Sequence, residues 1–163
     1  MVLKRLMVLA TGCLALLMTT AQVSAELPQE VSGRASVIDG DSLWVGKFRV
    51  RLWGVDAPED DQVCFLNKEE QECGSTATEK LEDLVEGRKI QCVPQAVDQP
   101  GRYLAKCQYE GVDLGHWMVT QGWAFALRET TDHYLAAEKK ARVDKLGLWQ
   151  SNFVYPWEWR DNN

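Results

Sequence analysis

The chain has 163 residues, of which 45% are hydrophobic, and its formal net charge at pH 7 is −6. This length suits one domain with a real hydrophobic core. The acidic balance excludes a protein that grips long nucleic acid through a broad basic surface, because that affinity comes mainly from Lys and Arg. A nucleic-acid site here would need a local arginine pocket or the charge of a metal ion.

Residues 1–25 are typical of a secretory signal peptide. Lys4 and Arg5 form a basic start, the apolar run after them is too short to span a bilayer, and a small-residue cleavage site ends at Ala25. Cleavage there leaves residues 26–163 as one domain, with 16 basic against 24 acidic residues and a net charge of −8. We therefore expect an exported protein, periplasmic or secreted, with no membrane contact after signal removal.

Cysteine usage agrees with export. A lipoprotein interpretation at Cys13 is disfavoured, because the apolar run continues past it to a better cleavage site. Four cysteines follow the signal segment: Cys64, Cys73, Cys92 and Cys107. In an exported chain they indicate two disulfides, with three connectivities. We favour Cys64–Cys73 and Cys92–Cys107. A zinc site is the alternative, but no two of these cysteines have the C-x-x-C spacing.

Strands are predicted at the start of the domain, over residues 31–39, 43–45 and 48–52. The last two form a hairpin, because Gly46 occupies the first central position of a tight turn. In that register Ser42 faces Arg51. The spacing therefore brings Asp41 close to Arg51 and near the strand that leads to Asp56.

A helix is predicted over residues 76–86, since Thr76 and Glu79 form a capping-box pattern and Gly87 follows the apolar face. Two strands are then expected, over residues 88–93 and 102–109. A hairpin centred between them places Cys92 opposite Cys107. Directly opposed cross-strand cysteines are close enough for a disulfide.

The last third is predicted to be helical. A short apolar face begins at Leu114 and is closed by Gly122, and a longer helix capped by Thr131 or Asp132 runs to Gly147. The aromatic tail at residues 155–160 is expected to pack back on the domain. Strands followed by late helices suggest an α+β fold, with a small Greek-key barrel as one form of it.

Three carboxylates and two guanidiniums occur in contexts that suggest metal-assisted attack on a phosphodiester: Asp41, Asp56, Glu59, Arg51 and Arg102. Carboxylate oxygens suit Ca²⁺ or Mg²⁺, guanidiniums match phosphate oxygens, and a spare carboxylate can take a proton from water. The simpler alternatives are a turn around Gly40 with Asp39 as a turn residue, and surface ion pairs for the arginines. His116 and His133 lack partners for a zinc or nuclease site, so we expect structural roles for both.

The segments Asp39–Ser42, Arg51–Glu59 and Gly101–Ala105 also carry a resemblance to the staphylococcal nuclease-like (thermonuclease) family, which extends from about Ser36 to Trp149. The resemblance implies an OB-fold, a five-stranded β-barrel with about three helices. It also implies a Ca²⁺-dependent nuclease that hydrolyses DNA and RNA to 3′-phosphate ends.

Residue roles follow from the same resemblance. Asp41 and Asp56 would bind Ca²⁺ through their carboxylates, and Ala57 through its carbonyl. Glu59 would act as general base on the attacking water or would orient it. The remaining pair, Arg51 and Arg102, would hold the phosphate and offset charge in the transition state.

Some binding groups of the family are altered. Pro100 stands where the family pattern Asp-x-Tyr-Gly-Arg has its tyrosine, and two tyrosines of the nucleotide site would fall near Arg128 and Thr130. The loop after Glu59, called the acidic loop below, carries Asp60, Asp61, Glu69, Glu70 and Glu72. We therefore expect weak binding of the DNA or RNA substrate. We also expect a monomer. The alternative is a catalytically weak or inactive OB-fold interaction or accessory module, for example one linked to extracellular polysaccharide production.

Overall fold

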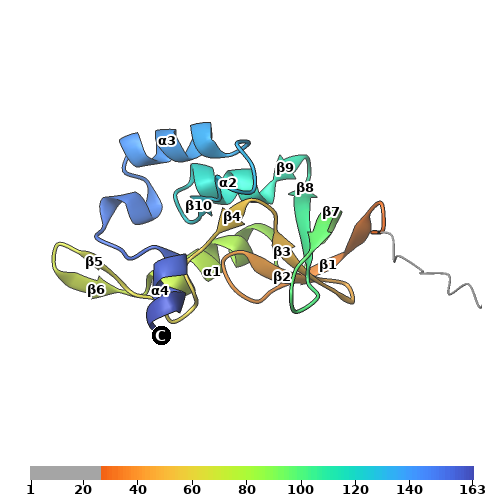
Figure 1. Ribbon diagram of the computed structural model, residues 1–163, viewed down its shortest axis with the longest axis horizontal. Coiled ribbons are helices and arrows are strands. Elements are labelled where there is room, and N and C mark those ends of the chain that lie inside the picture. Colours follow the sequence, from red (N-terminus) through yellow and green to blue (C-terminus); the bar gives the residue numbers. More distant parts are fainter. Residues whose placement is uncertain (1–26) are drawn as a thin grey trace, which may run out of the picture.

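The computed structural model describes residues 27–163, so the expected signal peptide at residues 1–25 lies outside the described residues. Five strands form the barrel: β1 (Val31–Val37), β2 (Ser42–Val45), β3 (Phe48–Leu52), β7 (Lys89–Val97) and β8 (Tyr103–Tyr109). They are ordered β3-β2-β1-β7-β8, and a parallel pairing of β3 with β8 closes the sheet on itself (Figure 1). The predicted α+β fold with a five-stranded OB barrel is confirmed.

The β2–β3 hairpin has the register expected from its turn. Ser42 pairs with Arg51 and Leu43 with Val50, and Gly46 has a φ of +60°. Strand β1 ends at Val37, two residues earlier than predicted. The reason lies in Asp39, whose carboxylate accepts hydrogen bonds from the backbone N–H groups of Asp41 and Ser42 and so turns the chain.

The β7–β8 hairpin places Cys92 directly opposite Cys107, and the two form the expected disulfide. Strand β7 continues to Val97, four residues past its predicted end. The register shifts between Pro94 and Ala96, which lets a proline lie within the strand. The short strand β9 (Val112–Asp113) extends this side of the sheet.

Helix α1 (Cys73–Val85) begins three residues before the predicted start, and the capping box at Thr76 is not formed. The Thr76 hydroxyl instead donates to the carbonyl of Glu72. The start is set by tertiary contacts: Cys73 is in a disulfide with Cys64, and Gly74 lies so close to the carbonyl oxygen of Glu59 that a Cβ there would be 1.7 Å from it.

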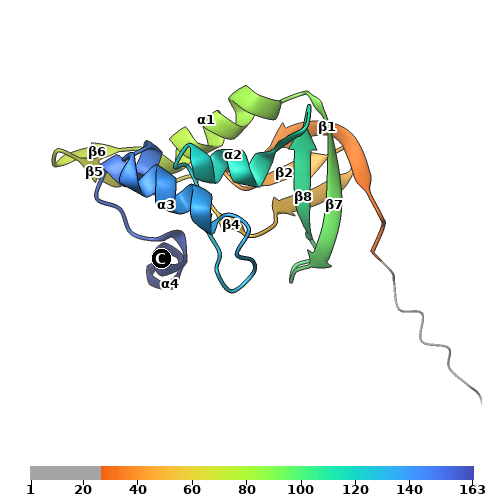
Figure 2. The same ribbon diagram turned by 90° about the horizontal axis from the view of Figure 1, so that it is seen from above.

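Two further strand pairs were not predicted. Strands β5 (Cys64–Leu66) and β6 (Glu69–Gln71) form a separate hairpin, and β4 (Val55–Asp56) pairs with β10 (Phe125–Ala126). The remaining helical segments are α2 (Leu114–Thr120), α3 (Leu135–Val143), the 3₁₀ helix η1 (Gly147–Gln150) and α4 (Pro156–Asn162). The described chain thus has four α-helices, one more than expected, and α3 lies against α2 (Figures 1 and 2).

The predicted limits of α3 were wrong at both ends. Its N-cap is Tyr134 rather than Thr131 or Asp132, because the Tyr134 ring is buried and its hydroxyl donates to Asp113 at 3.1 Å. The helix ends at Val143 because the chain turns at Lys145, which has a φ of +53°.

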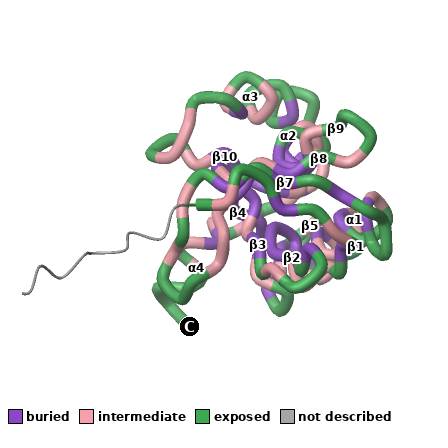
Figure 3. Tube along the Cα trace, turned by 90° about the vertical axis from the view of Figure 1, so that its right-hand side faces the viewer, coloured by how far each residue is buried: buried purple, intermediate pink, exposed green. Residues whose placement is uncertain are grey.

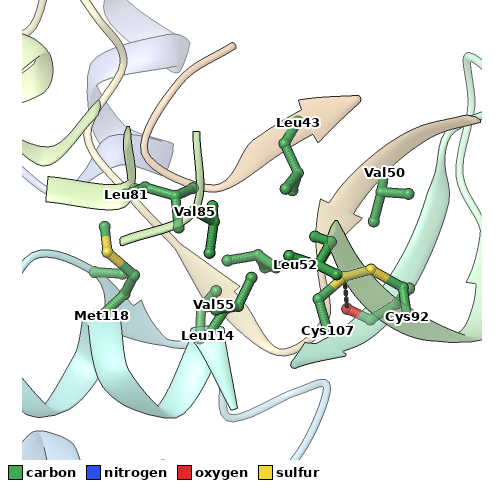
Figure 4. Packing of buried hydrophobic residues seen from close by; sticks show 14 of the residues in the cluster. Leu43, Val50, Leu52, Val55, Leu81, Val85, Cys92, Cys107, Leu114 and Met118 are labelled. Carbon is green, nitrogen blue, oxygen red and sulfur yellow. Dashed lines mark hydrogen bonds between the residues drawn. A yellow bond between two sulfur atoms is a disulfide. The ribbon is translucent and has the colours of Figure 1, made fainter. Parts of the chain in front are cut away.

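The main core fills the barrel and the space under α1 and α2. Leu43, Val50 and Leu52 from the barrel meet Leu81 of α1 and Leu114 of α2 (Figure 4). A smaller aromatic cluster, centred on Phe125, packs the C-terminal segment against the domain. No helix within residues 27–163 is long and apolar enough to cross a membrane.

Candidate active site

Asp41 lies where the Asp39 turn enters β2, and it is 5% exposed. Its Oδ1 accepts a hydrogen bond from the Ser42 hydroxyl at 2.9 Å. Its Oδ2 accepts from Arg51 Nη2 at 3.0 Å and from the Ala57 N–H at 3.1 Å. Burial raises the pKa of Asp41 to about 7, against the opposing effect of the Arg51 charge.

Asp56 reaches the same place from β4, where pairing with Phe125 of β10 fixes its backbone. It is 1% exposed, and its Oδ1 also accepts a hydrogen bond from Arg51 Nη2. One nitrogen of Arg51 therefore bridges two buried carboxylates that are separated by 15 positions in the sequence. Burial of Arg51 alone would lower its pKa, but Asp41 and Asp56 outweigh this effect and raise it.

Arg102 approaches from the start of β8 and is held by Asp98. The Asp98 carboxylate accepts from the backbone N–H of Arg102 at 2.7 Å and from its Nε and Nη2 at 2.8 Å each. The remaining nitrogen, Nη1, lies 3.4 Å from the Ser42 hydroxyl that donates to Asp41. The second arginine is thus aimed at the same site as the first.

Glu59 follows β4 on a short loop and is partly exposed. Its Oε1 accepts a hydrogen bond from Nη1 of Arg160 at 2.6 Å. Arg160 also makes a two-nitrogen contact with Asp56, from Nη1 to Oδ1 at 3.1 Å and from Nη2 to Oδ2 at 2.7 Å. The carboxylates raise the pKa of Arg160 further, which keeps it charged.

The structure brings the sequence-predicted residues together around one small cavity of about 30 Å³. Its lining comprises Asp39, Asp41, Ser42, Arg51, Ala57, Pro58, Glu59 and Arg102. A larger cavity of about 290 Å³ adjoins it, lined by Arg51, Asp56 and Arg160 together with Asp98, Leu104, Leu127, Glu129 and Trp157. Both cavities have Arg51 in their lining, so the candidate site extends from the carboxylates toward Trp157 of α4.

Sequence reasoning missed Arg160 and Trp157, which both come from α4. The usable signal was a lone arginine at the end of an otherwise aromatic tail, at residues 155–160. Nothing local tied that tail to Asp56, which is 104 positions away in the sequence.

The donor set suits a hard divalent cation with few protein ligands. Asp41 and Asp56 offer carboxylate oxygens that converge on a single nitrogen of Arg51, so the pair already accepts a cationic group. The carbonyl of Ala57 belongs to the residue that follows Asp56. Within residues 27–163 no cluster of three or more His, Cys, Asp or Glu side chains could hold a metal ion, so water or substrate oxygens would have to complete the shell.

The other candidate groups lie apart from these residues. His116 contacts Thr120 on α2, and His133 lies at the edge of the Tyr134 ring. The four cysteines of the described chain are joined as Cys64–Cys73 and Cys92–Cys107, which leaves none for zinc. The acidic loop lines a separate cavity, formed by Asp60, Asp61, Val63, Glu70, Glu72 and Ser75.

Comparison with known proteins gives a consistent result. A family model described as "Staphylococcal nuclease homologue" matches residues 49–151. Micrococcal nuclease of Shigella flexneri is 35% identical over 142 residues, which cover 76% of each chain. Succinoglycan biosynthesis protein ExoI of Rhizobium meliloti is 33% identical over 143 residues, covering 84% of this chain and 72% of the relative. An uncharacterized endonuclease of Haemophilus influenzae is 30% identical over 132 residues, covering 76% and 69%.

Proposed function

This chain belongs to the staphylococcal nuclease-like family, and from that premise we propose that it is a Ca²⁺-dependent, sugar-nonspecific nuclease. Its substrates would be DNA and RNA, hydrolysed to 3′-phosphate ends outside the cytoplasm. The observation that carries the proposal is the bridge from Arg51 to two buried carboxylates, Asp41 and Asp56. Burying two like charges side by side is costly, and a site that binds a cation and a phosphate accounts for that cost.

Each residue has a role that its position supports. Asp41, Asp56 and the Ala57 carbonyl would hold the cation, which when bound supplies Lewis-acid polarisation of a phosphoryl oxygen. Arg51 and Arg102 converge from neighbouring strands and would hold two phosphate oxygens where negative charge grows. A positioned guanidinium of this kind is worth on the order of 100- to 1000-fold in rate.

Glu59 would take the proton from the attacking water. It stands on a loop beside Asp56, and its side chain is 37% exposed, so water has access to it. Its present partner is Arg160, which must release Oε1 before that oxygen can accept a proton.

Export and weak substrate binding are further parts of the proposal. Two disulfides suit an oxidising compartment. The acidic loop and the net charge of −8 expected for residues 26–163 disfavour a long polyanion. We also infer a monomer, since the barrel closes within one chain.

The test is cleavage of single-stranded DNA and of RNA by the purified protein, in Ca²⁺ or in EGTA. Glu59→Gln should lose Ca²⁺-dependent cleavage and keep its fold, while Glu70→Gln, a change of the same type in the acidic loop, should retain activity. Products should carry 3′-phosphates. Cleavage that persists in EGTA would contradict the metal assignment.

A second function is favoured by specific observations. Arg160 occupies Glu59 and Asp56, and one relative is named as a succinoglycan biosynthesis protein. Under this alternative the domain is a weakly active or inactive accessory module, for example in extracellular polysaccharide production. A folded, disulfide-intact protein that cleaves neither DNA nor RNA at any Ca²⁺ concentration would favour the accessory module.

A further inference from the structure

Arg160 of helix α4 covers the two carboxylates on the open side of the candidate site. Its guanidinium contacts both oxygens of Asp56 at 3.1 and 2.7 Å and one oxygen of Glu59 at 2.6 Å. A two-nitrogen contact between guanidinium and carboxylate is among the strongest ion pairs that a protein forms. Asp56 is 1% exposed, so this pair is little screened by solvent on the carboxylate side.

With Arg51 on the other side, every oxygen of Asp56 accepts a guanidinium N–H. A divalent cation would need at least one of those oxygens. It would also experience repulsion from a guanidinium that is hydrogen-bonded to its own ligand, a few ångströms away. The cation and the Arg160 side chain therefore cannot both bind Asp56 at the same time.

Helix α4 is attached in a way that permits release. It has seven residues, and of these only Pro156 is buried. Most of α4 is exposed (Figure 3). Its base is fixed, because Gln62 donates to the Val154 carbonyl at 2.7 Å and Trp157 packs near Phe125. Within residues 27–163, the side-chain hydrogen bonds from α4 to the rest of the protein all come from Arg160. The last turn of the chain thus depends on this one ion-pair network.

We propose that Arg160 competes with the divalent cation for Asp56, so that docking of the Arg160 side chain and occupation of the site by metal exclude each other. The inference rests on the proposed metal site. It adds a regulatory contact within the chain. When metal is scarce, Arg160 neutralises the charges of Asp56 and Glu59. When metal binds, Arg160 leaves and Glu59 is free for proton transfer.

The direct test is calorimetric titration of the full protein with Ca²⁺. Arg160→Gln should bind Ca²⁺ more tightly than the natural protein, by roughly ten- to a hundredfold, since the three charge-assisted hydrogen bonds of Arg160 no longer need to be broken. Arg49→Gln is the matched control, because it removes the same charge from an exposed position on β3 and should change the affinity less than about twofold.

Two variants separate the possible failures. If the natural protein binds Ca²⁺ and Asp41→Asn does not, the proposed metal site is supported. If the Arg160→Gln protein then binds Ca²⁺ no more tightly than the natural protein, the competition is refuted while the proposed function stands. If neither the natural protein nor Arg160→Gln binds Ca²⁺, both proposals fall.

Hydrogen exchange on the natural protein gives a second, mutation-free readout. Saturating Ca²⁺ should increase exchange at the backbone amides of residues 159–163 by several-fold, because the last turn loses its anchor. The amides of β2 and β3 should stay the same or become more protected. Greater protection of residues 159–163 in Ca²⁺ would mean that Arg160 supports the loaded site, which contradicts the competition.

Discussion

Asp98 holds Arg102 at both ends, through the backbone N–H at 2.7 Å and through the side-chain Nε and Nη2 at 2.8 Å each. The five residues from 98 to 102 form the turn between β7 and β8. The turn therefore does more than connect two strands: it sets the direction of one of the two arginines that we assign to the phosphate.

Asp98→Asn should lower kcat by about tenfold and leave Ca²⁺ affinity unchanged, since it disorders the phosphate-side arginine and touches no proposed metal ligand. Arg102→Lys should lower kcat at least as much as Asp98→Asn does, because a planar guanidinium fork is replaced by a point charge. Steady-state kinetics measure the change in kcat, and titration with Ca²⁺ measures the metal affinity of the same variants. Asp83→Asn, an exposed carboxylate on α1, serves as control. A parallel loss of Ca²⁺ affinity in Asp98→Asn would refute the division of roles.

The same substitution has a pH signature. Burial tends to raise the pKa of Asp98, but hydrogen bonds and charge from Arg102 lower it overall. A lowered pKa contributes stability above the carboxyl's ordinary value of about 3.9 that is lost as pH falls through the native value. The difference in Tm between the natural protein and Asp98→Asn should therefore be present at pH 7 and disappear in strong acid. A pH-independent difference would assign the effect to neutral hydrogen bonding.

Asp41→Asn should abolish Ca²⁺-stimulated cleavage and at the same time stabilise the fold. Burial raises the Asp41 pKa to about 7. Between the ordinary carboxyl pKa and pH 7 the unfolded chain loses its proton first, so ionisation of Asp41 costs stability that is fully felt above pH 7. A difference of one pKa unit between the folded and unfolded states changes the free energy of unfolding by about 1.4 kcal/mol. Asp41→Asn should therefore raise the free energy of unfolding above pH 7 by on the order of 1 kcal/mol or more.

Thermal unfolding in EGTA from pH 4 to pH 8 measures this gain. Asp41→Asn should have the higher Tm at pH 8, and the two curves should converge near pH 4. Asp61→Asn, an exposed change of the same type, should show no such trend. A lower Tm for Asp41→Asn at pH 8 would mean that the Arg51 ion pair outweighs the burial cost.

The sequence predicted the parts of this fold that are set by local geometry. Gly46 fixes a two-residue turn, and that turn alone determines that Ser42 faces Arg51. The symmetry of the next hairpin likewise placed Cys92 against Cys107. These contacts follow from the two-residue repeat of β-strands and from the type of turn that joins them.

The parts that were missed depend on long-range contacts. Strands β4 and β10 have two residues each, too few to show any alternation. The start of α1 is set by Gly74 against Glu59, which overrides the capping pattern at Thr76. Arg160 meets Asp56 only because the aromatic tail folds back onto Phe125.

Removing acidic charge from the loop that follows Glu59 should strengthen the binding of long substrates. The double change Asp61→Asn and Glu70→Gln should lower KM for long DNA by about two- to fivefold and leave kcat unchanged, because less repulsion opposes the phosphate backbone. KM for a dinucleotide should not move. The matched control is Glu79→Gln with Glu82→Gln, two exposed positions on α1. An unchanged KM for long DNA would place the acidic loop away from the path of the substrate.

The two disulfides should differ in their effect on stability. Replacing Cys92 and Cys107 by Ala opens a loop of 15 residues and should cost about 3 kcal/mol on the chain-entropy scale, with a further loss because both side chains are buried in the main core. Replacing Cys64 and Cys73 opens a loop of only 9 residues and removes side chains from the smaller aromatic cluster instead of the main core, so it should cost less. Urea unfolding of the two double variants measures the order, and the reverse order would contradict the assignment of the barrel disulfide to the core.

The parallel seam between β3 and β8 determines when the candidate site can form during folding. Arg51 pairs with Leu104 across this parallel seam, so the two arginines meet only after strands about fifty residues apart have joined. Such distant pairings close late, since loop entropy must be overcome first. Helix signals should therefore recover earlier in refolding than phosphate binding does. Under the proposed function, a newly made chain would not cleave nucleic acids until its barrel is complete.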